Sequence, residues 1–160
     1  MQTAYLDLIA LVQRLHRQFL ELVKLELDTQ GVSDINNVQA LILFNVGDLE
    51  MTCSELTLRG CYLGSNVSHN LRRLVEAGYL LQERSVHDRR SVHVRLSDKG
   101  RALREKIATM HERHVATLSK GPLTQQDLSN AAATLRRLDR FWTVTVELGP
   151  RAAKLMAAAA

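Results

Sequence analysis

The spacing of apolar residues changes at Gly78 and again at Ser97, and this change constrains the fold more than any other feature of the sequence. Before Gly78 and after Ser97, apolar residues recur every three or four positions, which indicates helices with one buried face. Between them, Val92, Val94 and Leu96 alternate with polar residues, which is typical of a strand with one buried face. The chain is therefore predicted to be mainly α-helical, with one β-hairpin set between helices.

The predicted hairpin has a polar and basic tip. Its two strands are joined by residues 85–91, which include Asp88, Arg89 and Arg90. Arginines at the tip of a hairpin either keep it soluble or bind a polyanion. The neighbouring segments decide between these two interpretations.

Directly before the hairpin, residues 64–78 predict a short helix with two unlike faces. Its apolar residues would point inward: Val67, Leu71, Leu74 and Val75. Its other face would present Ser65, Asn66, Ser68, His69, Arg72 and Arg73. Small hydrogen-bonding side chains suit base edges in the major groove of DNA, and arginines suit phosphates. An ordinary amphipathic surface helix is the alternative.

The segment before this helix begins with a capping signature. Thr52 and Glu55 match the S/T-x-x-E capping box, so a short helix is predicted from there to Arg59, with Leu56 pointing inward. Only a tight connection separates it from the helix over 64–78. Two short helices joined this closely are the outline of a helix-turn-helix motif.

Longer helices are predicted on both sides. They cover residues 2–30, a second helix with Ser33 as its N-cap, residues 99–118 with Val115 among the inward residues, and residues 124–148. The first helix carries a heptad seam: Tyr5, Leu8, Val12, Leu15, Phe19 and Leu22. The last carries a similar stripe of Leu128, Ala131, Leu135, Leu138 and Trp142. Such stripes need other helices, which a second copy of the chain could supply.

The predicted fold class is thus a winged helix-turn-helix, a three-helix core plus a β-hairpin wing, flanked by long N- and C-terminal dimerisation helices. The winged lobe is expected over residues 33–100, the helical dimerisation region over 1–32 and 101–147, and a tail over 148–160. With 160 residues, the chain is long enough for one well-buried core.

Charge is distributed unevenly along the chain. Residues 1–50 carry three lysines and arginines against seven acids, whereas residues 51–101 carry nine against five. A local basic stretch is a better sign of nucleic-acid binding than the overall charge. No apolar run approaches the ~20 residues of a membrane span and no secretory signal precedes the first helix, so a cytoplasmic protein without membrane contact is expected.

The run from Asp88 to Gly100, DRRSVHVRLSDKG, resembles the MarR family of winged-helix transcription regulators, whose members typically show D-R-R-x-x-x-V-x-L-T/S-x-x-G there. The T-x-S-E-L of their third helix has its counterpart in residues 52–56, TCSEL. The resemblance covers about residues 33–118 and rests on the order of elements beyond that. It implies a transcription regulator, commonly a repressor, that binds double-stranded DNA as a homodimer with one groove helix and one wing per subunit.

The resemblance also implies roles for particular residues. Asp88 would orient Arg89 or Arg90 toward the minor groove or its phosphates. Family members often bind a small-molecule effector between the dimer helices and the DNA-binding lobe; candidates here are His16, Phe19, Phe44 and Arg104. Where many members have a T-V-T-R-like recognition surface, residues 66–69 read NVSH, so the operator sequence cannot be transferred from a relative.

Other functions leave weaker signals. Cys53, beside a helix N-terminus, and Cys61 could make the protein a thiol-redox-responsive regulator, although free cysteines are most often inert. The fold could also be a protein-interaction scaffold without specific DNA binding. His111 and His114 could chelate a metal, but no third ligand is near in sequence. No H-E-x-x-H motif, G-x-S-x-G elbow or phosphate-binding glycine loop is present, so neither an enzyme nor a cofactor is expected.

Overall fold

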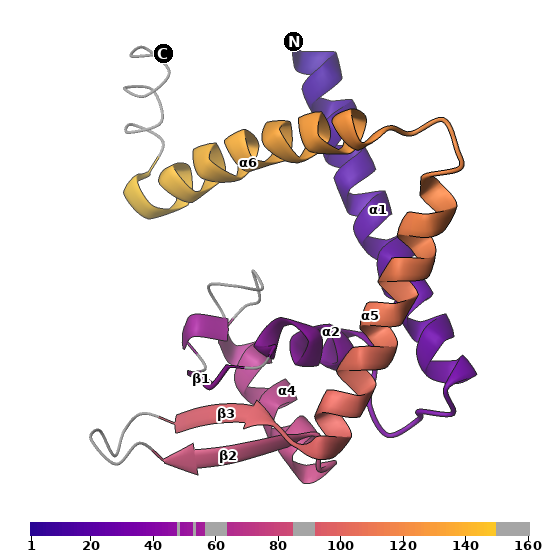
Figure 1. Cartoon of the computed structure of the whole chain (residues 1–160). Coiled ribbons are helices and arrows are strands. Elements are labelled where there is room, and N and C mark those ends of the chain that lie inside the picture. Colours follow the sequence, from indigo (N-terminus) through magenta and orange to yellow (C-terminus); the bar gives the residue numbers. More distant parts are fainter. Residues whose placement is uncertain (48, 53, 57–63, 85–91, 150–160) are drawn as a thin grey trace. The chain divides into compact units, whose positions relative to one another are not determined.

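The computed structural model describes residues 1–47, 49–52, 54–56, 64–84 and 92–149, with only the backbone at 64–66, 84 and 148 (Figure 1). The helices are α1 (Gln2–Thr29), α2 (Asn37–Val46), α4 (Gly64–Glu76), α5 (Asp98–Leu118) and α6 (Gln125–Leu148). The strands are β1 (Met51–Thr52), β2 (Leu80–Arg84) and β3 (Val92–Leu96). The chain divides into two compact units, Met1–Glu112 and Arg113–Ala160.

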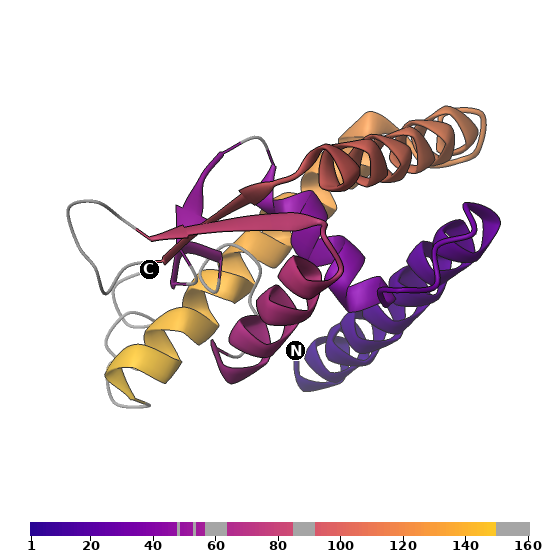
Figure 2. The same cartoon turned by 90° about the horizontal axis from the view of Figure 1, so that it is seen from below.

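The first unit contains a three-stranded antiparallel sheet in the order β1-β3-β2. β2 and β3 form the predicted hairpin (Figures 1 and 2). Leu80 lies opposite Leu96 at its base. β1 pairs with the other edge of β3, where Met51 lies opposite Val94. This third strand was not predicted, because two residues are too few to show an alternating pattern.

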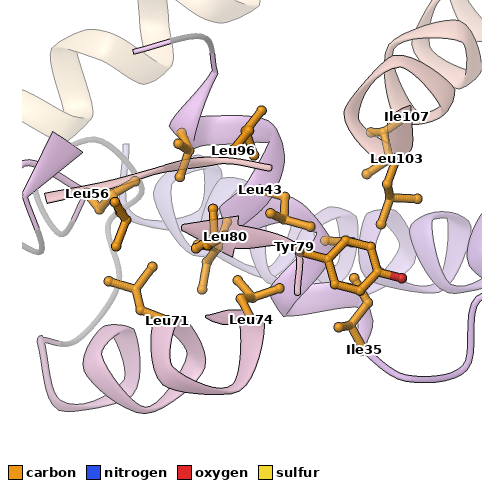
Figure 3. Close-up of a cluster of buried hydrophobic side chains, with 14 of the residues drawn as sticks. Ile35, Leu43, Leu56, Leu71, Leu74, Tyr79, Leu80, Leu96, Leu103 and Ile107 are labelled. Carbon is orange, nitrogen blue, oxygen red and sulfur yellow. The ribbon is translucent and has the colours of Figure 1, made fainter. Parts of the chain in front are cut away.

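The buried apolar residues that the structure describes form one hydrophobic core between this sheet and the helices of the first unit. α4 packs against β2, while α2 contacts β3, α4 and α1. Figure 3 shows Leu74 of α4, Leu80 of β2 and Leu96 of β3 within this core. The predicted inward residues of α4 are confirmed, since Val67 and Leu74 are fully buried. The mainly helical winged fold is therefore confirmed.

The second helix begins later than predicted. Asn36, not Ser33, is its N-cap: the Asn36 side chain accepts a hydrogen bond from the Gln39 backbone amide, and the Gln39 side chain accepts one from the Asn36 amide, both at 2.9 Å. This reciprocal capping box satisfies two amides that would otherwise lack partners. Asp34, which follows Ser33 and would have begun the first turn, instead binds side chains far along the chain.

The capping box predicted at the start of the short third helix is confirmed. The Thr52 amide donates to Glu55 at 2.7 Å, and the Glu55 amide donates to the Thr52 hydroxyl at 3.2 Å. Residues 54–56 are helical and Leu56 is fully buried. The described residues stop there, so the predicted end at Arg59 is outside them.

α1 buries apolar residues mainly near its C-terminal end. Val23 and Leu27 join the core, whereas Tyr5, Leu15 and Leu22 of the predicted seam stay 41%, 59% and 43% exposed. The buried residues of α5 end at Met110. Val115 lies further along α5 and is 65% exposed, so the prediction that it points inward is wrong.

In the second unit, α6 begins at the predicted capping box of Thr124 and Asp127. Its apolar stripe is largely exposed: Leu128 is 50%, Leu135 41% and Trp142 37% exposed. Within the described part of the chain, no helix is long and apolar enough to cross a membrane.

Candidate nucleic-acid interface

The outer face of α4 is polar and exposed, as the sequence predicted. Ser68, His69, Arg72 and Arg73 are all exposed, while Val67 and the other apolar residues one turn apart are buried. This division between faces follows from the apolar spacing, because residues three and four positions apart share a helix face. For Ser65 and Asn66, the structure gives the helical backbone but no side chains.

Backbone hydrogen bonds fix the C-terminal end of this helix. Gly78 has a φ of +78°, and the Tyr79 amide donates to the Leu74 carbonyl at 2.9 Å while the Gly78 amide donates to Val75 at 3.0 Å. This pair of bonds is a Schellman motif, which needs a left-handed residue at the position of Gly78. The chain can therefore turn directly from α4 into β2.

The two arginines of α4 differ in their surroundings. Arg73 lies 3.4 Å from Glu76 on the same helix, and both side chains are more than half exposed. Arg72 makes no ion pair with any described residue. The positive charge that faces solvent on α4 is thus less compensated at Arg72 than at Arg73.

Ion pairs also lie on the strands that support the wing. Arg95 of β3 binds Glu83 of β2 at 2.9 Å and lies 3.9 Å from Glu50. These acids compensate the charge of Arg95 at the base of the hairpin. Three predicted wing residues, Asp88, Arg89 and Arg90, lie outside the described residues, as do Cys53 and Cys61.

Two of the four effector candidates come together around His111, which was not among those candidates. Phe19 of α1 stacks on His111 of α5, with ring centroids 5.7 Å apart and planes at 29°. Phe44 of α2 lies against the same imidazole at 5.1 Å and 48°. His16 is exposed one turn before Phe19, and Arg104 is partly buried two turns before His111.

The helical spacing of Arg104 and His111 contained the missed signal. Residues seven positions apart lie on one face of a helix, so both project from the side of α5 that meets the core. The sequence pattern linked His111 only to His114, as two ligands of an incomplete metal site. Among the described residues, no group of three metal-binding side chains exists.

Comparison with known proteins identifies similar chains and folds. Residues 35–100 match the family described as a winged helix DNA-binding domain. The chain is 36% identical over 138 residues to the exopolysaccharide II synthesis transcriptional activator ExpG of Rhizobium meliloti (strain 1021), a match that spans 86% of this chain and 71% of ExpG.

Solved structures share the fold at lower identity. FabT of Streptococcus pneumoniae in complex with DNA matches with a TM-score of 0.70 and 21% identity over 87% of this chain and 97% of FabT. A mutant of MarR from E. coli in complex with operator DNA matches with a TM-score of 0.70 and 20% identity, over 84% of this chain and 95% of that MarR chain. Staphylococcus aureus MarR in complex with salicylate and kanamycin matches with a TM-score of 0.71 and 19% identity, over 88% of this chain and 93% of that MarR chain.

Proposed function

This chain belongs to the MarR family of winged-helix transcription regulators, and we propose that it regulates transcription as a homodimer that binds a pseudo-palindromic duplex. Each subunit would place α4 in the major groove and the wing, residues 85–91, near the minor groove. The observation that carries this proposal is the exposed polar face of α4, which is held on a buried apolar frame.

The side chains of α4 would have two roles. Ser65, Asn66, Ser68 and His69, near the helix N-terminus, would contact base edges, and asparagine is suited to adenine. Arg72 and Arg73 would hold phosphates, which position the helix without reading sequence. The wing residues Asp88, Arg89 and Arg90 would add phosphate or minor-groove contacts, favoured where that groove is narrow.

The exposed apolar residues of α1 and α6 support the homodimer. We assign residues 33–100 to the DNA-binding lobe, residues 1–32 and 101–147 to dimerisation, and residues 148–160 to a tail. A two-fold dimer would hold its two α4 helices about 34 Å apart, one turn of B-DNA. That spacing predicts an inverted repeat with half-sites centred about 10 base pairs apart.

The contact of Phe19 and Phe44 with His111 supports a small-molecule effector site where α1, α2 and α5 meet. Together with His16 and Arg104, these residues would offer aromatic faces and cationic or hydrogen-bonding groups, which suit a small aromatic acid. By linkage, an effector that weakens DNA binding must prefer the conformation that binds DNA poorly.

Selection of bound duplexes from a random pool at low salt tests the main proposal. An inverted repeat should be enriched, and the logarithm of affinity should fall linearly with the logarithm of salt concentration. Arg72→Gln should weaken binding to all sequences and reduce the salt slope by about one. Arg14→Gln, which removes the same charge from an exposed site on α1, is the matched control.

Two results would contradict the proposal. A protein that enriches no duplex at low salt would instead fit the protein-interaction scaffold. Equal effects of Arg72→Gln and Arg14→Gln would show that α4 does not face the DNA.

A further inference from the structure

The end of α4 is held by side chains from the start of α5, about twenty residues further along the chain. The Ser97 hydroxyl lies 2.7 Å from the Gly78 carbonyl oxygen and 3.0 Å from that of Tyr79. Ser97 also caps α5, since its hydroxyl accepts a hydrogen bond from the Gly100 amide at 3.0 Å. The first turn of α5 and the last turn of α4 are thus joined through one short segment.

Lys99 adds three contacts at the same place. Its ammonium group donates to the Ala77 carbonyl at 2.9 Å and to Asp34 at 2.7 Å, and it lies 4.0 Å from the centre of the Tyr79 ring. A cation beside the last carbonyls of a helix is favoured by the helix dipole. Lys99 therefore both caps α4 and links it to the segment before α2.

Asp34 completes the cluster from the connection between α1 and α2. Its second carboxylate oxygen accepts a hydrogen bond from the Tyr79 hydroxyl at 2.8 Å. The hydrogen bond from Lys99 holds the pKa of Asp34 below its usual range. The pKa of Tyr79 is raised, mainly because its hydroxyl is buried and also because it donates a hydrogen bond to Asp34. Asp34 is thus an anion that two donors hold in place. We call Asp34, Tyr79 and Lys99 the clasp.

We propose that Asp34 and Lys99 are positioning residues for DNA recognition: the clasp sets the direction in which α4 presents its polar face to the groove. Base-reading hydrogen bonds tolerate displacements of only about 0.5 Å. The clasp holds α4 at its C-terminal end, directly after the residues proposed to contact DNA. This inference rests on the proposed function, because it assigns a role within DNA binding by α4.

The direction in which operator affinity changes when Asp34 is neutralised separates positioning from a simple effect of charge. Replacing an acid by a neutral residue makes the protein more positive, which by charge alone should strengthen binding to DNA. Loss of the clasp should instead weaken binding to the operator and leave binding to unrelated DNA unchanged or slightly stronger. Charge and positioning thus predict opposite changes in operator affinity.

The test compares Asp34→Asn and Tyr79→Phe with wild type on two duplexes of equal length, the selected operator and a shuffled sequence. We expect both variants to lose between about two- and thirtyfold in operator affinity, with little change on the shuffled duplex. Asp28→Asn, at an exposed position of α1 that lies beyond the apolar seam of Tyr5 to Leu22, is the charge-matched control and should leave the ratio of the two affinities unchanged.

Lys99→Met provides a second arm, with Lys106→Met on the exposed side of α5 as its control. Lys99→Met should lower the ratio of operator to shuffled affinity, whereas Lys106→Met should not. Equal losses on both duplexes would mean that Lys99 only supplies charge. Urea unfolding of every variant reports the folded fraction, and losses explained by unfolding alone would also overturn the inference.

A wild-type protein that selects no operator would refute the proposed function, and the clasp would then be judged without DNA. Amide hydrogen exchange at Gly78 and Tyr79, whose amides close the end of α4, should be faster in Asp34→Asn than in Asp28→Asn. Equal exchange in the two variants would overturn the clasp as a positioning device.

Discussion

The apolar stripes of the winged lobe are buried, whereas those on the N-terminal part of α1 and on α6 stay partly exposed. Ile42 of α2 and Leu74 of α4 are fully buried within one chain. Leu15 of α1 and Leu128 of α6 remain 59% and 50% exposed, although both lie on regular apolar stripes. The core of the lobe, which also includes Val23 of α1 and Ile107 of α5, is therefore complete within one chain. The exposed stripes on α1 and α6 instead have the apolar spacing expected of one half of an interface.

From this difference we infer a separate task for each region. Burying a leucine side chain fully contributes about 1.5–3 kcal/mol. Several leucines that stay half exposed in the single chain would therefore add several kcal/mol of stability if a partner covered them. A second copy can supply that burial and also determine how far apart two α4 helices lie. The lobe would then read each half-site, and the outer helices would set the spacing between half-sites.

The largest predicted effect comes from breaking the proposed interface. Leu135→Asp places a charge on the α6 stripe at a residue that is 41% exposed in the single chain. Burying that charge at a dimer contact without a partner would cost several kcal/mol, about 3–5, so we expect a monomer. Operator affinity should then fall at least about a hundredfold, because the two half-sites are no longer bound together. Light scattering and operator titration would measure the two effects.

Leu81→Asp is the matched control, since Leu81 on β2 of the lobe is also 41% exposed. It should leave the oligomeric state unchanged. If both variants stay dimeric, or both become monomeric, the contrast between the lobe and the outer helices does not hold.

A smaller effect is expected from a cavity inside the lobe. Ile42→Ala removes a side chain with no exposed surface and should lower the free energy of unfolding by about 2–5 kcal/mol at every protein concentration. Leu128→Ala on α6 should instead destabilise the protein only at concentrations where the dimer forms, so its effect should shrink toward zero as dilution separates the subunits. Urea unfolding over a wide range of protein concentrations distinguishes the two variants. If the loss of unfolding free energy in Ile42→Ala changed with protein concentration, the core of the lobe would not be complete within one chain.

Gly100→Ala tests how closely two elements of the lobe approach each other. A Cβ atom at this position would lie 2.1 Å from the Tyr79 carbonyl oxygen, so the backbone must move. We expect a loss of about 1–3 kcal/mol in the free energy of unfolding, despite the better helix propensity of alanine. Gly121→Ala, where the nearest atom would be 3.3 Å away, should cost less than half as much. Unchanged stability of Gly100→Ala would show that α5 does not need this close contact.

Local patterns were enough to predict much of this fold. The alternation at Val92, Val94 and Leu96 predicted the hairpin, and the apolar spacing of α4 predicted which face would be exposed. The Thr52 and Glu55 capping box forms as its sequence signature indicates. Each of these features depends on residues that are near one another in the chain.

The failures arise where distant residues decide between local options. Ser33 and Asn36 are both good N-cap residues, and the contacts of Asp34 with Tyr79 and Lys99 lie 45 and 65 positions away. The contacts of His111 were not predicted, because its aromatic neighbours come from two other helices. The clasp was missed for the same reason, since no sequence period connects its three members.

The smallest predicted effect is that of alkaline pH on the stability that Tyr79 contributes through the clasp. The pKa of Tyr79 is raised above the usual value of 10.0, so the folded protein keeps this proton while the unfolded chain releases it. The stabilising effect is present below pH 10 and is lost as pH rises toward the folded-state pKa. By pH 11, wild type should lose about 1.4 kcal/mol relative to Tyr79→Phe, which has no phenol there. Urea unfolding of both proteins at pH 9, 10 and 11 measures this, because the titration of the other tyrosines cancels in the difference. A constant difference across that range would show that Tyr79 ionises freely and that Asp34 does not hold its hydroxyl.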